Sequence, residues 1–260
     1  MILIGTDFSR GSLHATRIAL VLARKTESKV LLLHAFKAQS RSGMFLSMDR
    51  YIRQAAEMDM EDFVEQIEPE LRPYVSETVV VRGFAEEVIM QYDGQEDIGL
   101  VVVGTQGSSA IREIFMGRTA NILLNKLQSP ILAVPEESDE QPPQRLIFAW
   151  DGLHMEQSDI DRLIDWAGKL RVELEVMHVH TAESAPCDEA VTAGFRSKGI
   201  DINMIPGEDD VKDEIDDYLS QFKHAWLCLI KRERGFFEPF FHDSMVKREL
   251  FSTTSPILII

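Results

Sequence analysis

Residues 99–107 read GLVVVGTQG: an uninterrupted apolar run, residues 100–103, is followed by glycines at 104 and 107. A strand that is apolar at every position is expected where both faces of a sheet are covered, as in parallel sheets flanked by helices. On both sides of this stretch, short β-branched runs alternate with helical patterns, which is typical of βαβ units. The sequence therefore predicts an α/β fold with a parallel sheet and helices on both of its faces.

The chain also repeats itself, because the same landmarks occur twice in the same order. They are an apolar run closed by aspartate, a strand closed by histidine, and a terminal strand that begins with SPIL. In the two copies they fall at Asp7 and Asp151, at His34 and His178, and at residues 129–134 and 255–260. Two copies of one module fit a chain of 260 residues, since domains usually contain about 100 to 150 residues.

Two domains are therefore expected, residues 1–138 and 145–260, with an acidic, proline-containing segment typical of a linker between them. The first copy carries an insertion over residues 40–72, where the pattern from 48 to 67 predicts a long helix. The expected strands are residues 1–5, 29–35, 76–82, 99–104 and 130–134 in the first copy, and 146–150, 172–180, 200–205, 225–230 and 256–260 in the second.

Composition excludes several classes of function. A formal net charge of −16 repels the phosphate backbone, so nucleic acid and anionic membranes are disfavoured as partners. No apolar run approaches the roughly 20 residues that span a bilayer, and the first residues show no secretion signal, so we expect a cytoplasmic protein. The two cysteines, Cys187 and Cys228, cannot form a disulfide framework or a zinc site by themselves.

The glycines that follow residues 99–103 suggest an anion site. Gly104 and Gly107 leave the strand, and Gly117 opens a later helix, so main-chain N–H groups there can face a phosphate without a Cβ in the way. Such glycines also occur in strand-to-helix turns for steric reasons alone. Asp7, at the end of another strand, can accept hydrogen bonds from a ribose or a base amine. Alternatively, it can cap the N-terminus of the helix that follows.

Together these motifs resemble a tandem member of the universal stress protein family. The resemblance rests on TDFS at residues 6–9, LLH at 32–34, the spacing G-x2-G-x9-G from Gly104 to Gly117, and SPILAVP at 129–135. It implies two tandem five-stranded, Rossmann-like domains similar to adenine nucleotide alpha hydrolases, with strands one and four adjacent. It also implies ATP over that gap, with or without Mg²⁺, and dimerisation through the last strand, either as a homodimer or as a pseudo-dimer of the two copies.

The resemblance implies a role for each matching residue. Asp7 corresponds to the carboxylate near the ribose and adenine, the main chain of Ala35 to the contact with the base, and two glycine segments to the phosphate cradle. One departure is Arg118, where the family has Ser or Thr; an arginine can pair with a phosphate or fill the pocket. The resulting candidate contacts are Thr6, Asp7, Ala35, Val103, Gly104, Gly107, Gly117, Arg118 and Thr119.

The second copy has lost this pattern. Ile230, Glu233 and Asp243 stand where the three glycines stood, so we expect no ATP there, and the phenylalanines of residues 236–241 either pack internally or meet a partner. His178 and His180 share a strand face and could bind a metal, although an ordinary strand-end role fits His178 better. No serine–histidine–aspartate order suggests catalysis.

The expected function is thus a non-catalytic stress-response protein that binds an adenine nucleotide and contacts an unidentified protein partner. A nucleotide-free interaction scaffold and a slow ATPase are the alternatives.

Overall fold

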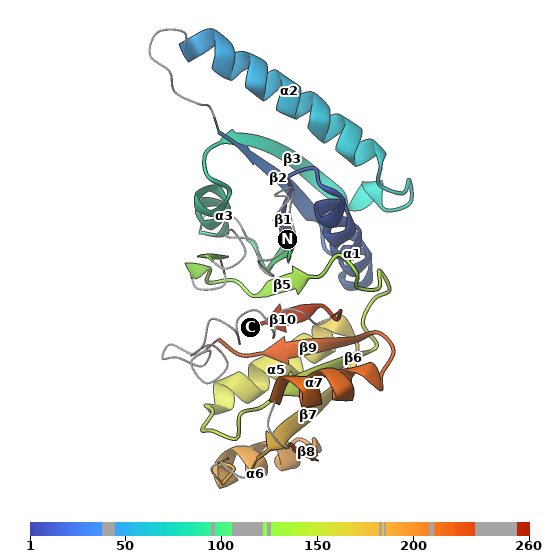
Figure 1. Cartoon of the computed structure of the whole chain (residues 1–260), viewed down its shortest axis with the longest axis vertical. Coiled ribbons are helices and arrows are strands. Elements are labelled where there is room, and N and C mark those ends of the chain that lie inside the picture. The colour runs from blue at the N-terminus through green and yellow to red at the C-terminus, as the bar shows by residue number, and fades with distance from the viewer. Residues whose placement is uncertain are drawn as a thin grey trace. The chain divides into compact units, whose positions relative to one another are not determined.

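The computed structural model describes residues 1–37, 45–94, 97–105, 122–123, 126–181, 184, 186–207, 211–231 and 254–260, with side chains of the first insertion helix from residue 49 on. Contacts divide the chain into two compact units, Met1–Glu140 and Gln141–Ile260 (Figure 1). No helix within these ranges has both the length and the apolar surface that a membrane-spanning helix requires. Each unit is described below by itself.

The first unit contains a parallel sheet in the order β3-β2-β1-β4-β5. Strands β1 and β4 are neighbours, as the family resemblance implied, so the winding of the chain reverses between them. The strands are β1 (Ile2–Gly5), β2 (Val30–Phe36), β3 (Val75–Arg82), β4 (Leu100–Gly104) and β5 (Ile131–Val134). The described helices are α1 (Arg10–Thr26), α2 (Phe45–Glu65), the 3-10 turn η1 (Arg72–Tyr74) and α3 (Ala85–Asp93).

The second unit repeats this topology with the sheet order β10-β9-β6-β7-β8. Its strands are β6 (Arg145–Ala149), β7 (Glu173–His180), β8 (Ile202–Pro206), β9 (Ala225–Leu229) and β10 (Ile257–Ile259). Its described helices are α5 (Gln157–Leu170), α6 (Glu189–Ser197) and α7 (Val211–Ser220). All the strands expected from the sequence are confirmed to within a residue or two, and so is the α/β class.

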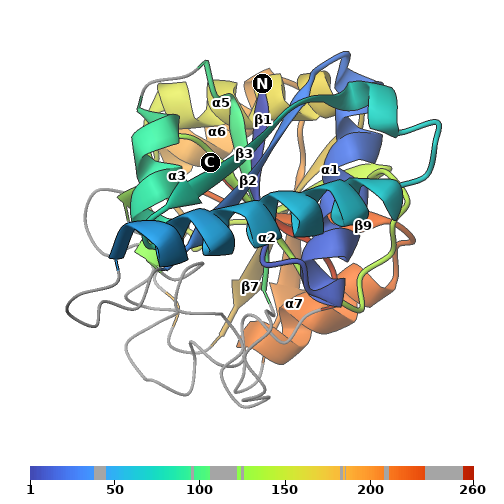
Figure 2. The ribbon, with the colours of Figure 1, turned by 90° about the horizontal axis from the view of Figure 1, so that it is seen from above.

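The apolar run in β4 is buried along its whole length, from Leu100 to Val103, because helices cover both faces of the sheet. Figures 1 and 2 show α1 and α2 on one face of the first sheet and α3 on the other. Helix α1 begins at a well-formed cap, in which Ser9 Oγ accepts the Ser12 N–H at 3.2 Å. It ends at Thr26 and is capped by Glu27, which adopts the left-handed conformation with φ of 55°.

The insertion predicted in the first copy forms α2, which has 21 residues against nine in its counterpart α6. Its inner face is the buried series Ala56, Met60 and Phe63, continued past the helix end by Ile67. These positions recur at helical spacing, so one apolar stripe packs on the sheet while the opposite face carries charged side chains. In Figure 2, α2 runs across the foreground of β2 and β3, which it contacts.

The acidic segment expected as a linker is partly bound to the first unit. Glu136 forms an ion pair with Arg10 of α1 at 3.4 Å. His14 contacts Ser138 Oγ through Nε2 at 3.0 Å and Glu140 Oε1 through Nδ1 at 3.2 Å. Each exposed ion pair contributes only about 0 to 1 kcal/mol, but together they hold residues 136–140 against α1. The composition of the segment did not reveal this, because its partners lie far away in the sequence.

Candidate functional site

The main chain that follows β1 is fixed to β2 by two hydrogen bonds, and a third forms within the turn. The Thr6 N–H donates to Leu33 O at 2.8 Å, and His34 Nδ1–H donates to Thr6 O at 2.8 Å. Because a carbonyl can only accept, this contact places the proton of a neutral His34 on Nδ1. Asp7 Oδ1 then accepts the Ser9 N–H at 3.1 Å. The turn thus presents the Asp7 carboxylate at the exposed carboxyl edge of the sheet.

Phe8 adopts a left-handed backbone conformation, with φ of 62°. A non-glycine residue pays about 1 to 2 kcal/mol for this conformation, so surrounding contacts must hold it. Its ring stacks on His34 at 4.2 Å between centroids, with 23° between the planes, and lies 5.7 Å from the Phe63 ring. Its N–H donates to Thr6 Oγ1 at 3.0 Å. The aromatic stack therefore stabilises the turn that carries Asp7.

The end of β4 lies at the same edge as this turn. The β1–β4 pairing runs from Ile2 with Leu100 to Ile4 with Val102, so both chains leave the sheet side by side. Gly104 pairs with Val134 of β5. In open parallel sheets, ligands bind at the carboxyl edge where the winding reverses, and this edge between β1 and β4 is such a point.

The structure describes five of the nine candidate contact residues. Asp7 and Gly104 follow adjacent strands, and half-buried Ala35 lies near the end of β2. The side chain of Val103 is 5% exposed, so only its main chain can reach a ligand. The Thr6 hydroxyl is buried and lies 2.9 Å from Ser12 Oγ, which commits it to the turn. The remaining candidates, Gly107, Gly117, Arg118 and Thr119, lie outside the described residues.

The second unit repeats the histidine and aspartate contacts of this turn. His178 Nδ1–H donates to Trp150 O at 2.9 Å, and the Leu153 N–H donates to Asp151 Oδ1 at 3.0 Å. Gly152, with φ of 82°, occupies the position of the left-handed Phe8. The sequence interpretation treated the two strand-end histidines as ordinary residues and missed this role. The equal separation of the repeated aspartates and histidines was the signal that could have revealed it.

Large side chains occupy the second unit where the first has small ones. Trp150 replaces Thr6; it is 2% exposed, and its Nε1–H donates to Leu153 O at 2.9 Å. Ile230, in the place of Gly104, is fully buried. The corresponding position at the carboxyl edge of the second sheet therefore carries larger apolar side chains. Glu233, Asp243 and the phenylalanine cluster lie outside the described residues.

The His178 and His180 rings are 6.3 Å apart. Among the described residues, they are not joined by a third histidine, cysteine or carboxylate in a metal-binding group. The hydrogen bond of His178 to Trp150 O gives this residue a structural role in the turn instead.

A charged cluster beside this second turn predicts an elevated histidine pKa. His154 contacts Asp188 Oδ2 through Nδ1 at 3.2 Å and Glu156 Oε1 through Nε2 at 3.4 Å. These hydrogen bonds, first that of Asp188 and then that of Glu156, raise the pKa of His154 above its ordinary value of about 6.5. An NMR titration should show this rise, and Asp188→Asn should reverse most of it. An unchanged His154 pKa in that variant would contradict the assignment.

The sign of the pH effect follows from the direction of each shift. Because the pKa of His154 is raised by folding, its contribution to stability is present below the ordinary histidine pKa and is lost as pH rises through the raised value. The pKa of Asp188 is lowered, chiefly by the Val191 N–H, so its contribution is present above the ordinary aspartate pKa and is lost as pH falls through the lowered value. The pair therefore stabilises the fold at pH values between the titration of Asp188 and the titration of His154.

Comparison with known proteins identifies the family. The model of the universal stress protein family matches residues 1–135, which include the turn at Asp7 and the end of β4. The chain belongs to the universal stress protein family. The resemblance drawn from the TDFS, LLH and glycine motifs is thereby confirmed. A search of curated proteins found no match.

Solved structures extend the likeness to the whole chain. A universal stress protein from Archaeoglobus fulgidus DSM 4304 is similar over 99% of this chain and 94% of its own, with 15% identity and a TM-score of 0.71. A candidate universal stress protein from Pseudomonas aeruginosa UCBPP-PA14 covers 100% of this chain and 92% of its own, with 16% identity and a TM-score of 0.60. At these identities, the comparison establishes the fold of this universal stress protein across both units.

Proposed function

We propose that the first unit binds ATP or a related adenine nucleotide at the carboxyl edge of β1 and β4, and that the protein is a non-catalytic, cytoplasmic regulator. The observation that supports this most is the exposed Asp7 carboxylate, held by a hydrogen-bonded turn beside the strand that ends at Gly104. Occupancy of the site would bias dimerisation or contact with a protein partner during stress.

The available groups suit the parts of such a ligand. An exposed carboxylate accepts hydrogen bonds from ribose hydroxyls, and the half-buried end of β2 at Ala35 offers main-chain groups to a base. The glycine segments that begin at Gly104 offer N–H groups to the phosphates, with or without Mg²⁺. The fixed turn matters because a preorganised group loses little conformational freedom when the ligand binds.

Asp7→Ala should weaken ATP binding about tenfold, equivalent to about 1.4 kcal/mol, because it removes both the carboxylate and the bond that orders the turn. Asp7→Asn keeps an acceptor for the Ser9 N–H and should fall between Asp7→Ala and the unmodified protein. Calorimetric titration with ATP measures the affinities. Heating the purified protein and chromatographing the supernatant shows whether an adenine nucleotide co-purifies.

Asp151→Ala is the matched control, since Asp151 makes the same turn contact in the second unit. ATP affinity should remain unchanged in this variant. Loss of binding in Asp151→Ala alone would place the ligand in the second unit. Absence of both a co-purified adenine nucleotide and calorimetric binding would reject the proposed function.

The alternative is a nucleotide-free interaction scaffold, favoured by Arg118 in the place of Ser or Thr. Arg118→Ser separates the two functions. If the chain binds no ATP and this variant gains no affinity, the scaffold function is supported.

A further inference from the structure

Among the described strands, β3 is the outermost strand of the first sheet. The Gly83 N–H donates to Phe36 O of β2 at 2.9 Å. Main-chain groups alternate in direction along a strand, so the N–H and C=O groups of Thr78, Val80 and Arg82 face away from β2. Strand β3 therefore offers a row of main-chain donors and acceptors at the sheet edge.

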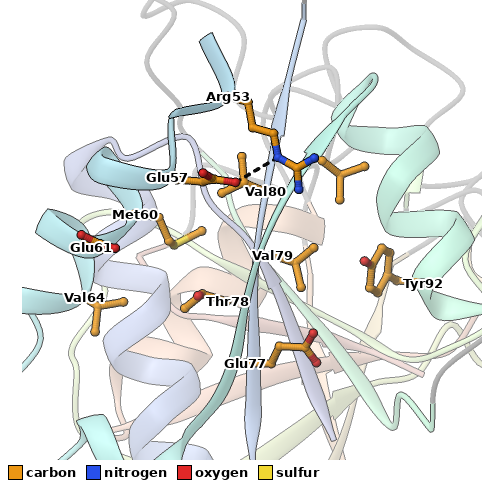
Figure 3. A pocket seen from close by; sticks show the side chains of 11 residues that line it. Arg53, Glu57, Met60, Glu61, Val64, Glu77, Thr78, Val79, Val80 and Tyr92 are labelled. Carbon is orange, nitrogen blue, oxygen red and sulfur yellow. Dashed lines mark hydrogen bonds and ion pairs between the residues drawn. The ribbon is translucent and has the colours of Figure 1, made fainter. Parts of the chain in front are cut away.

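This edge lies in a groove. Figure 3 shows β3 running between side chains of α2 on one side and Tyr92 of α3 on the other. The cavity has a volume of about 700 Å³. Its lining comprises Arg53, Glu57, Met60, Glu61 and Val64 of α2, the β3 residues from Glu77 to Val81, and Tyr92. The groove depends on the insertion, because α2 supplies one entire wall.

Among the described residues that line the groove, the charged side chains are predominantly acidic. Glu57, Glu61 and Glu77 face it together with a single cation, Arg53, which forms an ion pair with Glu57 at 2.9 Å. Glu61 and Glu77 are exposed. Apolar side chains of α2 and β3, including Met60 and Val79, complete the surface. An occupant of complementary chemistry would carry cations between apolar or small side chains.

We propose that this groove binds an extended, lysine- or arginine-containing peptide segment of a partner protein, which adds to β3 as a further strand. In this mode of recognition, main-chain hydrogen bonds give affinity and side-chain contacts give specificity. Natural sheets usually protect an exposed edge with proline, lysine or a covering element. Here β3 carries the charged side chains of Glu77 and Arg82 but no proline, and its edge lies between α2 and α3.

A second copy of this chain fits the groove less well. Edge-to-edge pairing of two β3 strands would bring α2 of each copy to the same junction, with the acidic Glu57 and Glu61 of both helices close together. A single extended strand brings no second helix, and basic side chains on it would find carboxylates on the groove wall.

The test uses the full chain and capped octapeptides in which lysine alternates with valine or with threonine. Calorimetry should show saturable binding, and NMR should place the shifts at β3 and the inner side of α2. Peptides N-methylated at alternate amides should bind at least tenfold more weakly, because they cannot complete the strand ladder. Equal binding of methylated and unmethylated peptides would overturn the proposal, as would the absence of binding.

Two pairs of variants test the edge and the charge separately. Val80→Pro removes an outward N–H, a change that an edge strand tolerates, and should weaken peptide binding at least tenfold. Val80→Thr keeps this N–H, and its affinity for the peptide should stay within about twofold of that of the unmodified protein. Glu61→Lys should weaken binding about tenfold, and Asp59→Lys, the same charge change on α2 outside the groove, should have little effect. Equal effects within either pair would overturn the proposal. A concentration-dependent dimer abolished by Val80→Pro would assign the edge to a second copy instead.

Discussion

Glu175→Ala is expected to lower the free energy of unfolding of the second unit by about 3 kcal/mol. The Glu175 carboxylate, on β7, is 13% exposed and accepts hydrogen bonds from the Arg145 guanidinium and the Tyr218 hydroxyl, and from Asn203 Nδ2 at 2.8 Å. Removing it leaves Tyr218 and Asn203 without their acceptor and leaves Arg145 with only its exposed partner, Glu173, at 2.7 Å. Arg145 is 28% exposed and keeps some solvation. The expected loss of unfolding free energy is therefore at the lower end of the range for broken buried ion pairs.

Tyr218→Phe is the control, because it removes one donor and leaves the ion pair intact. Burial, and then the Glu175 carboxylate, raise the pKa of Tyr218, so the phenol stays a neutral donor throughout the ordinary pH range. This variant should cost about 1 kcal/mol. Urea unfolding, with hydrogen exchange along β6 and β7 to locate the effect, measures both values. Equal losses in the two variants would show that the carboxylate does not organise the network.

Gly152→Ala should destabilise the second unit by a similar amount, about 3 kcal/mol. Alanine at φ of 82° is strained, and its Cβ would lie 2.9 Å from His178 Cε1. The His178 ring cannot move away easily, because it is 3% exposed and its Nδ1–H is bound to Trp150 O. Phe8 is tolerated at the matching position of the first unit because its ring stacks on the histidine there.

Gly199→Ala separates backbone strain from the steric contact. Gly199 has a similar φ of 74°, but a Cβ there would meet nothing within 4 Å. Gly199→Ala should therefore lower the free energy of unfolding by about 1 kcal/mol, which is the backbone strain alone. The difference between the two alanine variants, read from their urea unfolding curves, measures the contact with His178. If the two variants cost the same, the histidine does not restrict the turn.

Much of the fold could be predicted from the sequence because its signals are local. The apolar run from Leu100 to Val103 indicated a strand covered on both faces, and the repeated aspartates and histidines indicated that one module occurs twice. The long insertion helix was visible in its apolar spacing. The site was predicted less completely: Asp7 and Gly104 were placed at one sheet edge, but the hydrogen bonds that fix the turn were not anticipated.

The amino-acid sequence by itself determined the α/β class, the order of the strands along the chain, and the family. These properties follow from patterns among residues that are close in sequence, and such patterns do not depend on where a segment packs in the fold. Only the tertiary structure decided that His34 and His178 hold the two turns, that Phe8 is forced into a left-handed conformation, and that α2 makes a groove of the β3 edge. These properties depend on which distant segments pack together, and that is settled only when the sheet assembles and its helices bury their apolar faces.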